Sequence, residues 1–273
     1  MMSAEILSKG PGQDKIAELV QVRLRKQSNL SSALFDVSSF ADGGDKSISF
    51  PRWANKFSVQ KLSGSQKGDD QEAVFELDKL ELTEEAHIQW AIKKFDQAKS
   101  KVNILQQAIA EATTAHGNQF NEDLYNVLKN GIHADNKVSG SLTQAKVVDM
   151  IVKANKARMP RQDRTFAFGN DEYGALLKID GFVDASKSNL EIVRTGQIGT
   201  LYGIPVIEDD ALDTGVGLLI HRQSAAYGFG ALPAIEDQKA IEYGTGSRRW
   251  VMDQLYGQKI MNEGKLVVSI GLA

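Results

Sequence analysis

Apolar residues that recur at helical spacing predict one long helix over residues 99–130. The apolar stripe consists of Val102, Leu105, Ile109, Ala112, Phe120, Leu124 and Val127. Asn130 and Gly131 provide a stop signal. At 1.5 Å per residue this helix is roughly 48 Å long, which is more than a compact domain needs. His116 falls on the stripe, where a packed core histidine is favoured over a metal ligand.

Alternation of apolar and polar residues predicts β structure over residues 47–82. The apolar members are Ile48, Phe50, Phe57, Val59, Phe75, Leu77, Leu80 and Leu82. Between them lies KLSGSQKGDDQE (61–72), which is too polar to form a core. The pattern therefore predicts a two-stranded excursion with a polar tip. Because an isolated hairpin is marginally stable in water, we expect the excursion to rest on another molecule.

Residues 1–46 are typical of an arm and not of a domain. A short amphipathic helix is expected at about 13–27, with its apolar side formed by Ile16, Leu19, Val20 and Leu24. Polar and small residues dominate from there to Lys46. The cluster Arg23, Arg25 and Lys26 could meet nucleic acid, but a solvated helix face is the favoured interpretation.

From residue 132 to the end the pattern predicts a mixed α/β region. A helix is expected over 142–157, with its apolar face formed by Val147, Val148, Ile151 and Val152. Strands are expected at 164–168, 204–207, 217–221 and 225–229. Asn170 is expected to cap a short helix that carries Asp171 and Glu172 in its first turn. The last segment alternates Leu266, Val268, Ile270 and Leu272, which predicts a closing strand buried on one face.

Composition narrows the function classes. The 273 residues carry a net charge of −3, which argues against general nucleic-acid binding. The absence of cysteine excludes disulfides, a thiolate nucleophile and cysteine metal sites. We expect neither a signal peptide nor a membrane span, since the N-terminal sequence and the apolar runs match neither pattern.

Candidate catalytic groups do not form a recognisable motif. His221 and Ser224 with Asp209 or Asp210 could be a triad, but the sequence does not fix their geometry. The acidic run that begins at Glu208 could bind a hard cation, although an acidic turn that solvates a strand end is favoured.

Two triplets combine basic and aromatic residues, at 51–53 and 248–250. Such triplets can stack on nucleic-acid bases. In a chain of negative net charge, interface anchors are favoured, and Trp53 is the candidate in the first triplet. The glycines of TGQIGTLYG (195–203) do not match a dinucleotide-binding loop and are expected to serve turns and close packing.

Four segments, in this order, resemble the major capsid proteins of tailed phages of the Hong Kong ninety-seven type. In MPRQDRTFAFGNDEYGALL (159–177), a helix ends at a proline and an arginine four residues later precedes a strand. The stretch from 180 to 212 combines a phenylalanine, a small-polar loop and the spacing G-x-x-G-x-x-x-G. GLLIHRQSAAYGFG (217–230) is similar to the following strand with its histidine and alanine pair, and LYGQKIMNEGKLVVSI (255–270) to the Tyr-Gly turn and final strand. The resemblance covers about 50–273.

The resemblance implies an α+β phage major capsid fold whose parts have the following bounds. They are an N-terminal arm (1–46), an extended β-hairpin loop (47–82), a peripheral domain with the long spine helix (83–131 and 243–273) and an axial domain (132–242). It also implies a non-enzymatic protein without cofactor or metal, which assembles as pentamers and hexamers into an icosahedral head around double-stranded DNA. Such a protein is made in the host cytoplasm and ends in the virion, with scaffolding, portal and decoration proteins as possible partners and no membrane.

Six residues are candidate assembly contacts. Phe57, Val59, Phe75 and Leu77 on the excursion are expected to meet a neighbouring subunit, with Trp53 as an anchor near its base. Asp213 is expected in a surface turn (211–216) at the tip of the axial domain. Two alternatives to a phage capsid protein remain open: an encapsulin-like shell that encloses enzyme cargo, and a small α/β hydrolase that uses His221 and Ser224.

Overall fold

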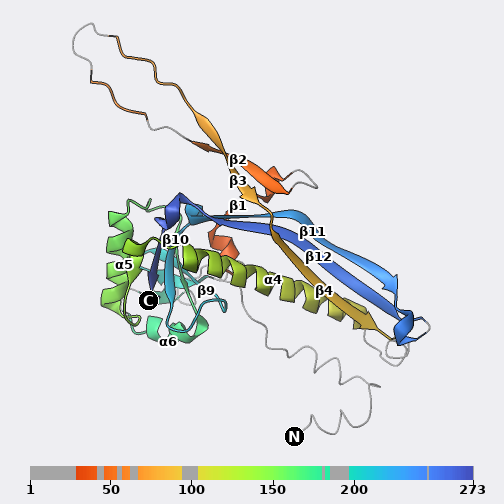
Figure 1. Ribbon diagram of the computed structural model, residues 1–273. Helices are drawn as coiled ribbons and strands as arrows, with labels where there is room; N and C mark the ends of the chain where they lie inside the picture. Colours follow the sequence, from red (N-terminus) through yellow and green to blue (C-terminus); the bar gives the residue numbers. More distant parts are fainter. Residues whose placement is uncertain are drawn as a thin grey trace.

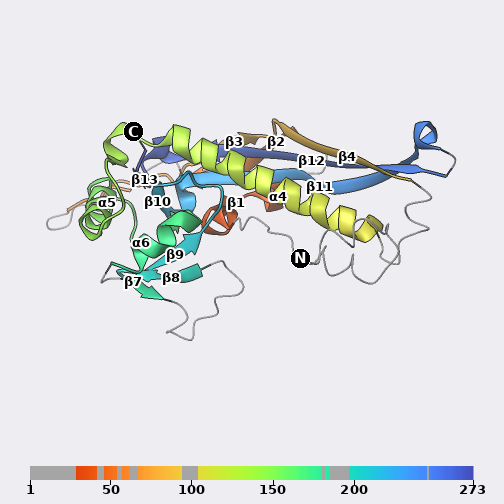
Figure 2. The same ribbon diagram turned by 90° about the horizontal axis from the view of Figure 1, so that it is seen from below.

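The computed structural model shows an elongated molecule from which a β-hairpin projects (Figure 1). The structure describes residues 29–41, 46–53, 57–61, 67–93, 104–179, 182–184, 197–244 and 246–272. The helix predicted at 13–27 lies outside the described residues, as does Val102. Three parts can be followed in Figures 1 and 2: a seven-stranded sheet with its helices, a long helix beside a four-stranded sheet, and the hairpin.

The seven-stranded sheet has the order β5-β13-β10-β6-β9-β8-β7. Its strands are β5 (Lys137–Val138), β6 (Arg164–Phe168), β7 (Phe182–Asp184), β8 (Gln197–Leu201), β9 (Ile204–Glu208), β10 (Gly217–His221) and β13 (Val267–Ile270). The predicted strands at 164–168 and 217–221 are confirmed with the same bounds, and that at 204–207 is confirmed to within one residue. Tyr202 and Gly203, both at positive φ, make the tight turn between β8 and β9.

Both faces of this sheet are covered, so its central strands are apolar at consecutive positions. Leu218 and Ile220 pack in a core with Leu124 of the long helix α4 (Ile104–Gly131). Leu219, between them, faces the other way into a core with Met150 of α5 (Gln144–Lys156). A strand that alternates between two buried faces has no polar side.

The same arrangement corrects the expectation for the last strand. All four residues of β13 are buried, not every second one, because Val267 faces the α4 core and Val268 faces the α5 core. The apolar face predicted for α5 was also partly wrong. Val147 is buried as expected, but Val148 and Val152 are each 43% exposed.

The buried positions of α5 are Val147, Met150 and Ala154, which follow the spacing of one helical face. Ile151 is partly buried beside them. The helix begins after Thr143, whose side chain accepts a hydrogen bond from the Lys146 backbone N–H.

The four-stranded sheet has the order β1-β11-β12-β4, and α4 runs along it (Figure 2). Its strands are β1 (Phe35–Asp36), β4 (Glu84–Ile92), β11 (Ala225–Lys239) and β12 (Arg248–Ile260). The sequence pattern predicted only the first five residues of β11 and neither β4 nor β12. The long helix is confirmed; it has 28 residues, about 42 Å at 1.5 Å per residue, and continues through His116 and Gly117.

The sheets do not follow the predicted division at residue 242. β11, assigned to the axial domain, lies in the four-stranded sheet, whereas β13, assigned to the peripheral domain, lies in the seven-stranded sheet. The sheets differ from the predicted division because β11 and β12 form one long antiparallel pair, and the predicted boundary falls between these two strands.

The described part of the expected arm, residues 29–41, packs into the core and is not loose. Leu30 and Leu34 are buried among the residues that line α4, and Val37 joins a smaller core at the base of the hairpin. β1 then pairs in parallel with the start of β11.

Candidate assembly surface

The hairpin consists of β2 (Ser47–Trp53) and β3 (Phe75–Glu81), whose ladder pairs Ile48 with Leu80 and Pro51 with Leu77. Alternate residues of a strand point to opposite faces. Ile48 and Leu80 are buried against Val37 at the base of the hairpin. Pro51 and Leu77 belong to the other face and are exposed. The hairpin therefore has one anchored face and one exposed face that carries apolar residues toward its far end.

Strand β12 holds the base of the hairpin. The Lys259 ammonium donates hydrogen bonds to the Asp78 carboxylate (2.6 Å) and to the Lys79 carbonyl (3.0 Å). Although burial alone would raise it, the pKa of Asp78 is lowered by the hydrogen bond from Lys259. At Gly257 the strands pass so closely that an added Cβ would lie 2.1 Å from the Glu81 carbonyl oxygen.

Beyond the ladder, side-chain amides bridge the two arms. Gln71 Oε1 accepts from the Ser58 backbone N–H (2.7 Å), and Gln71 Nε2 donates to the Ser58 carbonyl (2.6 Å). Gln60 makes the equivalent pair of bonds with the backbone of Asp69, at 2.8 and 3.3 Å. Two glutamines thus keep the arms together where β2 and β3 have ended.

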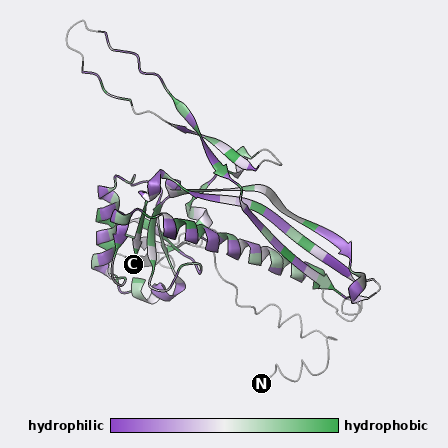
Figure 3. Ribbon diagram, viewed as in Figure 1, coloured by the Kyte–Doolittle hydropathy of each residue, from purple (hydrophilic) through white to green (hydrophobic). Residues whose placement is uncertain are grey.

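Four of the predicted contact residues are strongly exposed. The exposed fractions are 56% for Phe57, 93% for Val59, 63% for Phe75 and 75% for Leu77. Figure 3 shows hydrophobic stretches on both strands of the hairpin. We call these four residues the hairpin strip. Exposed apolar residues gathered on one element mark an interaction surface more often than singly scattered ones.

Of the other two predicted contact residues, only Asp213 has a described side chain, and it lies on another part of the subunit. Trp53 pairs with Phe75 along the ladder, but its side chain lies outside the described residues. The Asp213 carboxylate accepts hydrogen bonds from Lys129 (2.5 Å) and Tyr125 (2.9 Å) of α4. These bonds lower the pKa of Asp213.

The turn around Asp213 is also tied to the 3-10 helix Asn170–Glu172, which directly precedes α6 (Tyr173–Leu176) and contains the two acidic residues predicted in the first turn of the short helix. Asp171 accepts a hydrogen bond from the Thr214 hydroxyl, and Glu172 accepts one from the Gly215 backbone N–H. The turn is thus bound within its own chain and is not a free tip. Its place at a capsomer axis stays a prediction.

The hydrolase alternative is contradicted by the contacts of its residues. His221 Nδ1 accepts from the Gln223 backbone N–H, while the buried Ser224 hydroxyl meets no hydrogen-bond partner in the described part of the chain. Asp209 accepts from backbone N–H groups of Asn29, Leu30 and Ala211. These residues are not hydrogen-bonded to one another as a triad requires.

The acidic run beside β9 is not the solvated turn that was favoured. Asp209 is fully buried and binds backbone amides. Within the described residues, no three His, Asp or Glu side chains are grouped so that they could hold a metal ion. Among these residues, none of the helices combines the length and the apolar character that crossing a membrane requires.

The basic and aromatic triplet at 248–250 is used inside the subunit. Arg248 pairs with Asp237 and Arg249 with Glu242. Trp250 lies opposite Trp90 of β4 and is 8% exposed. His116, on α4, is buried as expected.

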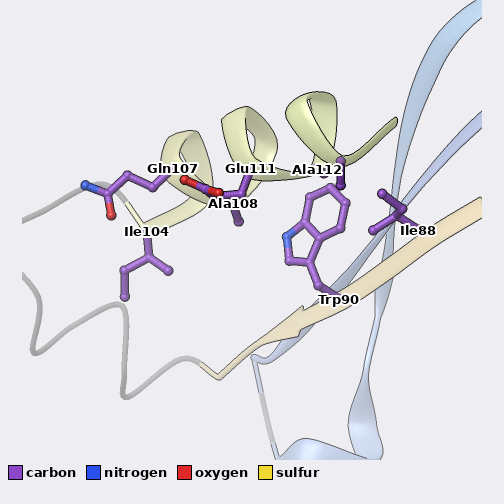
Figure 4. A pocket seen from close by; sticks show the side chains of 8 residues that line it. Ile88, Trp90, Ile104, Gln107, Ala108, Glu111 and Ala112 are labelled. Atoms are coloured by element: carbon purple, nitrogen blue, oxygen red, sulfur yellow. The ribbon is translucent and has the colours of Figure 1, made fainter. Parts of the chain in front are cut away.

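A second apolar feature, which the sequence pattern did not reveal, is a groove of about 450 Å³ between β4 and the first half of α4 (Figure 4). Apolar residues form most of its lining, together with two polar ones of α4: Ile88, Trp90, Ile104, Gln107, Ala108, Glu111, Ala112 and Ala115. The Trp90 ring points toward the alanine side of α4 (Figure 4). We call it the spine groove.

Comparison with known proteins identifies the fold. The family-model scan gives no match to the sequence, and the search of curated proteins finds none either. A structure from Mycobacterium phage Che8 is 15% identical and aligns with a TM-score of 0.65 over 91% of this chain and 93% of its own. The capsid structure of the cyanophage P-SCSP1u is 10% identical, with a TM-score of 0.64 over 91% and 89%.

The asymmetric unit of the bacteriophage PhiM1 mature capsid is a further neighbour, 12% identical, with a TM-score of 0.61 over 91% of this chain and 88% of its own. The similarity covers about nine-tenths of this chain, and it is a similarity of structure at 10–15% sequence identity. The chain therefore has the α+β fold that these phage capsid structures share.

Proposed function

We propose that this chain is the major capsid protein of a tailed phage, a structural subunit that self-assembles as pentamers and hexamers into an icosahedral head around double-stranded DNA. The observation that carries the proposal is the fold shared with phage capsid structures over about nine-tenths of the chain. Its role is structural and not enzymatic. Its place is the virion, after assembly in the host cytoplasm.

The shape of the subunit supports this function. A projecting hairpin with an exposed apolar face is unfavourable for a protein that stays monomeric in water, because it leaves large hydrophobic side chains hydrated. It suits a subunit that bridges neighbours. We therefore keep the hairpin strip, with Trp53 near it, as the proposed contact surface toward an adjacent subunit.

The decisive experiment is expression of the chain, followed by sedimentation velocity and negative-stain electron microscopy. Closed icosahedral particles built from this chain are the expected result. A stable, discrete small oligomer under all assembly conditions would contradict the proposal. A variant in which residues 60–74 are replaced by a short Gly-Ser turn tests the role of the hairpin tip in the same measurements.

The shortened variant should fold, because the described residues of this range, 60–61 and 67–74, contribute no buried side chain to the subunit cores. Its circular dichroism should match that of the full chain, while closed particles are lost. Normal particles from the shortened chain would show that the hairpin tip is not an assembly element. A failure to fold would show that it belongs to the core of the subunit.

An encapsulin-like protein would form the same kind of closed shell, but the shell would enclose a cargo enzyme instead of DNA. Packaged double-stranded DNA in particles isolated from infected cells supports the phage head, whereas a co-purifying cargo enzyme supports the alternative. Scaffolding, portal and decoration proteins are the further partners that we propose, and particle formation by the chain alone tests the need for a scaffold.

A further inference from the structure

A pocket of about 360 Å³ lies at the C-terminal end of α5 (labelled in Figure 1), where this helix meets the 3-10 helix Ala134–Asn136 and the segment after β12. Its lining is mainly basic and polar: His133, Asp135, Asn136, Lys153, Lys156, Ala157 and Lys265. Three lysines thus share one pocket with a single aspartate, on a chain whose net charge is −3. We call it the lysine pocket.

The acidic groups at the lysine pocket do not neutralise all of its lysines. Glu263 pairs with Lys265. The Asp135 side chain is 90% exposed, so water and salt screen its charge. Among the described residues, no carboxylate forms an ion pair with Lys153 or Lys156. These two ammonium groups therefore carry the surplus positive charge of the pocket.

The Lys153 ammonium is fixed by backbone groups. It donates hydrogen bonds to the carbonyl oxygens of Asp135 (2.7 Å) and Lys137 (2.6 Å). Because an ammonium has three donors, one N–H is left for a ligand, and two neutral acceptors leave its full charge in place. A side chain that is already held loses little conformational entropy when it binds. Lys153 is therefore preorganised to bind an anion.

The backbone around the pocket is fixed by a buried asparagine. Asn136 is 4% exposed, and its Nδ2 donates to the carbonyl oxygens of Lys265 (3.0 Å) and Val267 (2.9 Å). These bonds fasten the 3-10 helix to the start of β13. The pocket is therefore part of the folded backbone and does not depend on where exposed side chains point.

Helix stabilisation explains one part of this arrangement. Lys153 and Lys156 lie in the last turn of α5, where positive charge interacts favourably with the helix dipole. That effect does not account for Lys265, which comes from a distant part of the chain. Nor does it account for the bonds that hold the Lys153 ammonium on carbonyl oxygens of another segment.

We propose that the lysine pocket binds a phosphate group, with Lys153 and Lys156 as its main ligands and Lys265 as a third cation. Phosphate oxygens accept several charge-assisted hydrogen bonds at once, so one group can contact two or three ammonium groups. A free phosphate and a nucleic-acid backbone offer this same chemistry. The site lies within one subunit, so it does not rest on the proposed shell function.

Inorganic phosphate is the probe for the first test. The full chain, unassembled and at pH 7, is titrated with phosphate and, separately, with sodium chloride of the same ionic strength. A ligand that binds only the folded state raises the melting temperature as its concentration rises, so phosphate should stabilise the wild-type subunit more than chloride does. Isothermal titration calorimetry gives the dissociation constant. Equal effects of phosphate and chloride would overturn the inference.

Variants of α5 test the assigned ligands. Lys156→Gln removes an exposed cation and should weaken phosphate binding by about threefold or more, whereas Lys156→Arg keeps the charge and should retain binding. Lys146→Gln is the matched control, because it removes the same charge from the same helix at a residue that lies outside the pocket and pairs with Asp149. Equal dissociation constants for Lys156→Gln, Lys146→Gln and the wild type would remove the assignment.

A short DNA duplex identifies the source of the phosphate. If a nucleic-acid backbone occupies the pocket, the duplex competes with inorganic phosphate. Lys156→Gln then lowers the slope of log affinity against log salt concentration by about 0.9, as expected for the loss of one phosphate contact. A duplex that does not compete assigns the same pocket to a free phosphate.

A further measurement needs no variant and is independent of any effect of a substitution on folding. In ¹H–¹⁵N NMR spectra of the wild-type subunit, phosphate should shift the backbone amide signals of Asp135, Ala157 and Lys265, which line the pocket. The amide signals of Leu124 and Leu128, in the core beside α4, should stay in place. Shifts spread over the whole molecule, or no shifts at the pocket, would overturn the inference.

Discussion

The carboxylate of Asp209 accepts a hydrogen bond from the backbone N–H of Leu30 at 2.7 Å, across 179 positions of sequence. The same oxygen accepts from the N–H of Asn29, and the other carboxylate oxygen accepts from Ala211. Burial raises the pKa of Asp209, while the three backbone N–H groups act in the opposite direction. One buried side chain thus attaches the N-terminal segment to the end of β9.

Replacing Asp209 should detach that segment. Asp209→Ala leaves three backbone donors without their acceptor, and each buried unsatisfied donor costs on the order of 1–3 kcal/mol. We expect the free energy of unfolding, measured by urea denaturation of the unassembled subunit, to fall by roughly 3 kcal/mol. The neighbouring change Asp210→Ala is the control. It removes an exposed contact with Asn170 and should cost under about 1 kcal/mol. Equal effects of the two changes would contradict the attachment.

The C-terminal half of the long helix, which includes Leu124, should be sensitive to the loss of side-chain volume. Leu124 is fully buried between the sheet and the N-terminal segment, so Leu124→Ala should lower the free energy of unfolding by about 2–5 kcal/mol. Val152→Ala on α5 removes a half-exposed side chain and should change it by less than about 1 kcal/mol. Ile109, earlier on α4, is only partly buried, and a change there should be milder than at Leu124.

Gly257 should allow the close contact between β12 and the base of the hairpin. Gly257→Ala puts a methyl group where the Glu81 carbonyl stands, so β12 and β3 must separate, at a cost of about 1–3 kcal/mol. Gly174→Ala is the matched control, since an added Cβ there meets nothing within 4 Å. Thermal unfolding of the subunit gives the first readout and electron microscopy of particles the second. A normally stable Gly257→Ala subunit would show that the strands can give way.

Acid should weaken the link between α4 and the turn at Asp213. The pKa of this carboxylate is lowered in the folded state, first by the hydrogen bond from Lys129 and then by that from Tyr125. Its contribution to stability is therefore complete above the unfolded pKa of about 3.9 and is lost as the pH falls through the lower folded value.

The test of this link compares Asp213→Asn with the wild-type chain. The side chain is about half exposed, so the difference at pH 7 should stay below about 1 kcal/mol. Melting temperatures measured from pH 7 to pH 2.5 should differ by a constant amount down to about pH 4 and then converge. A difference that grows toward low pH would give the opposite sign and refute the assignment.

The sequence pattern alone identified the long helix, the hairpin and most strands of the seven-stranded sheet, because each shows its periodicity in local apolar spacing. It also indicated Phe57, Val59, Phe75 and Leu77 as apolar residues without a core of their own, and the structure leaves all four exposed. The order of four weak segments was enough to predict the capsid fold.

Other features depended on contacts between distant segments. The second part of β11 and the whole of β12 were missed, since these strands are stabilised by each other and by β4, and the last five residues of β11 (235–239) are exposed. Asp209 has the local sequence of a solvated turn, and only the return of Leu30 to β9 buries it. The spine groove likewise exists because β4 and α4 meet.

The sequence by itself thus determined the long helix, the hairpin and several strands of the seven-stranded sheet, and it indicated four apolar residues of the hairpin that the structure leaves exposed. The pattern of apolar residues in one helix or strand shows only which of its faces is buried in the simplest case, a single covered side. Tertiary structure alone decided that β13 is buried on both faces, that Asp213 binds α4, and that a groove opens beside Trp90. Each of these features depends on a second element that packs against the first, and that second element comes from a distant part of the chain.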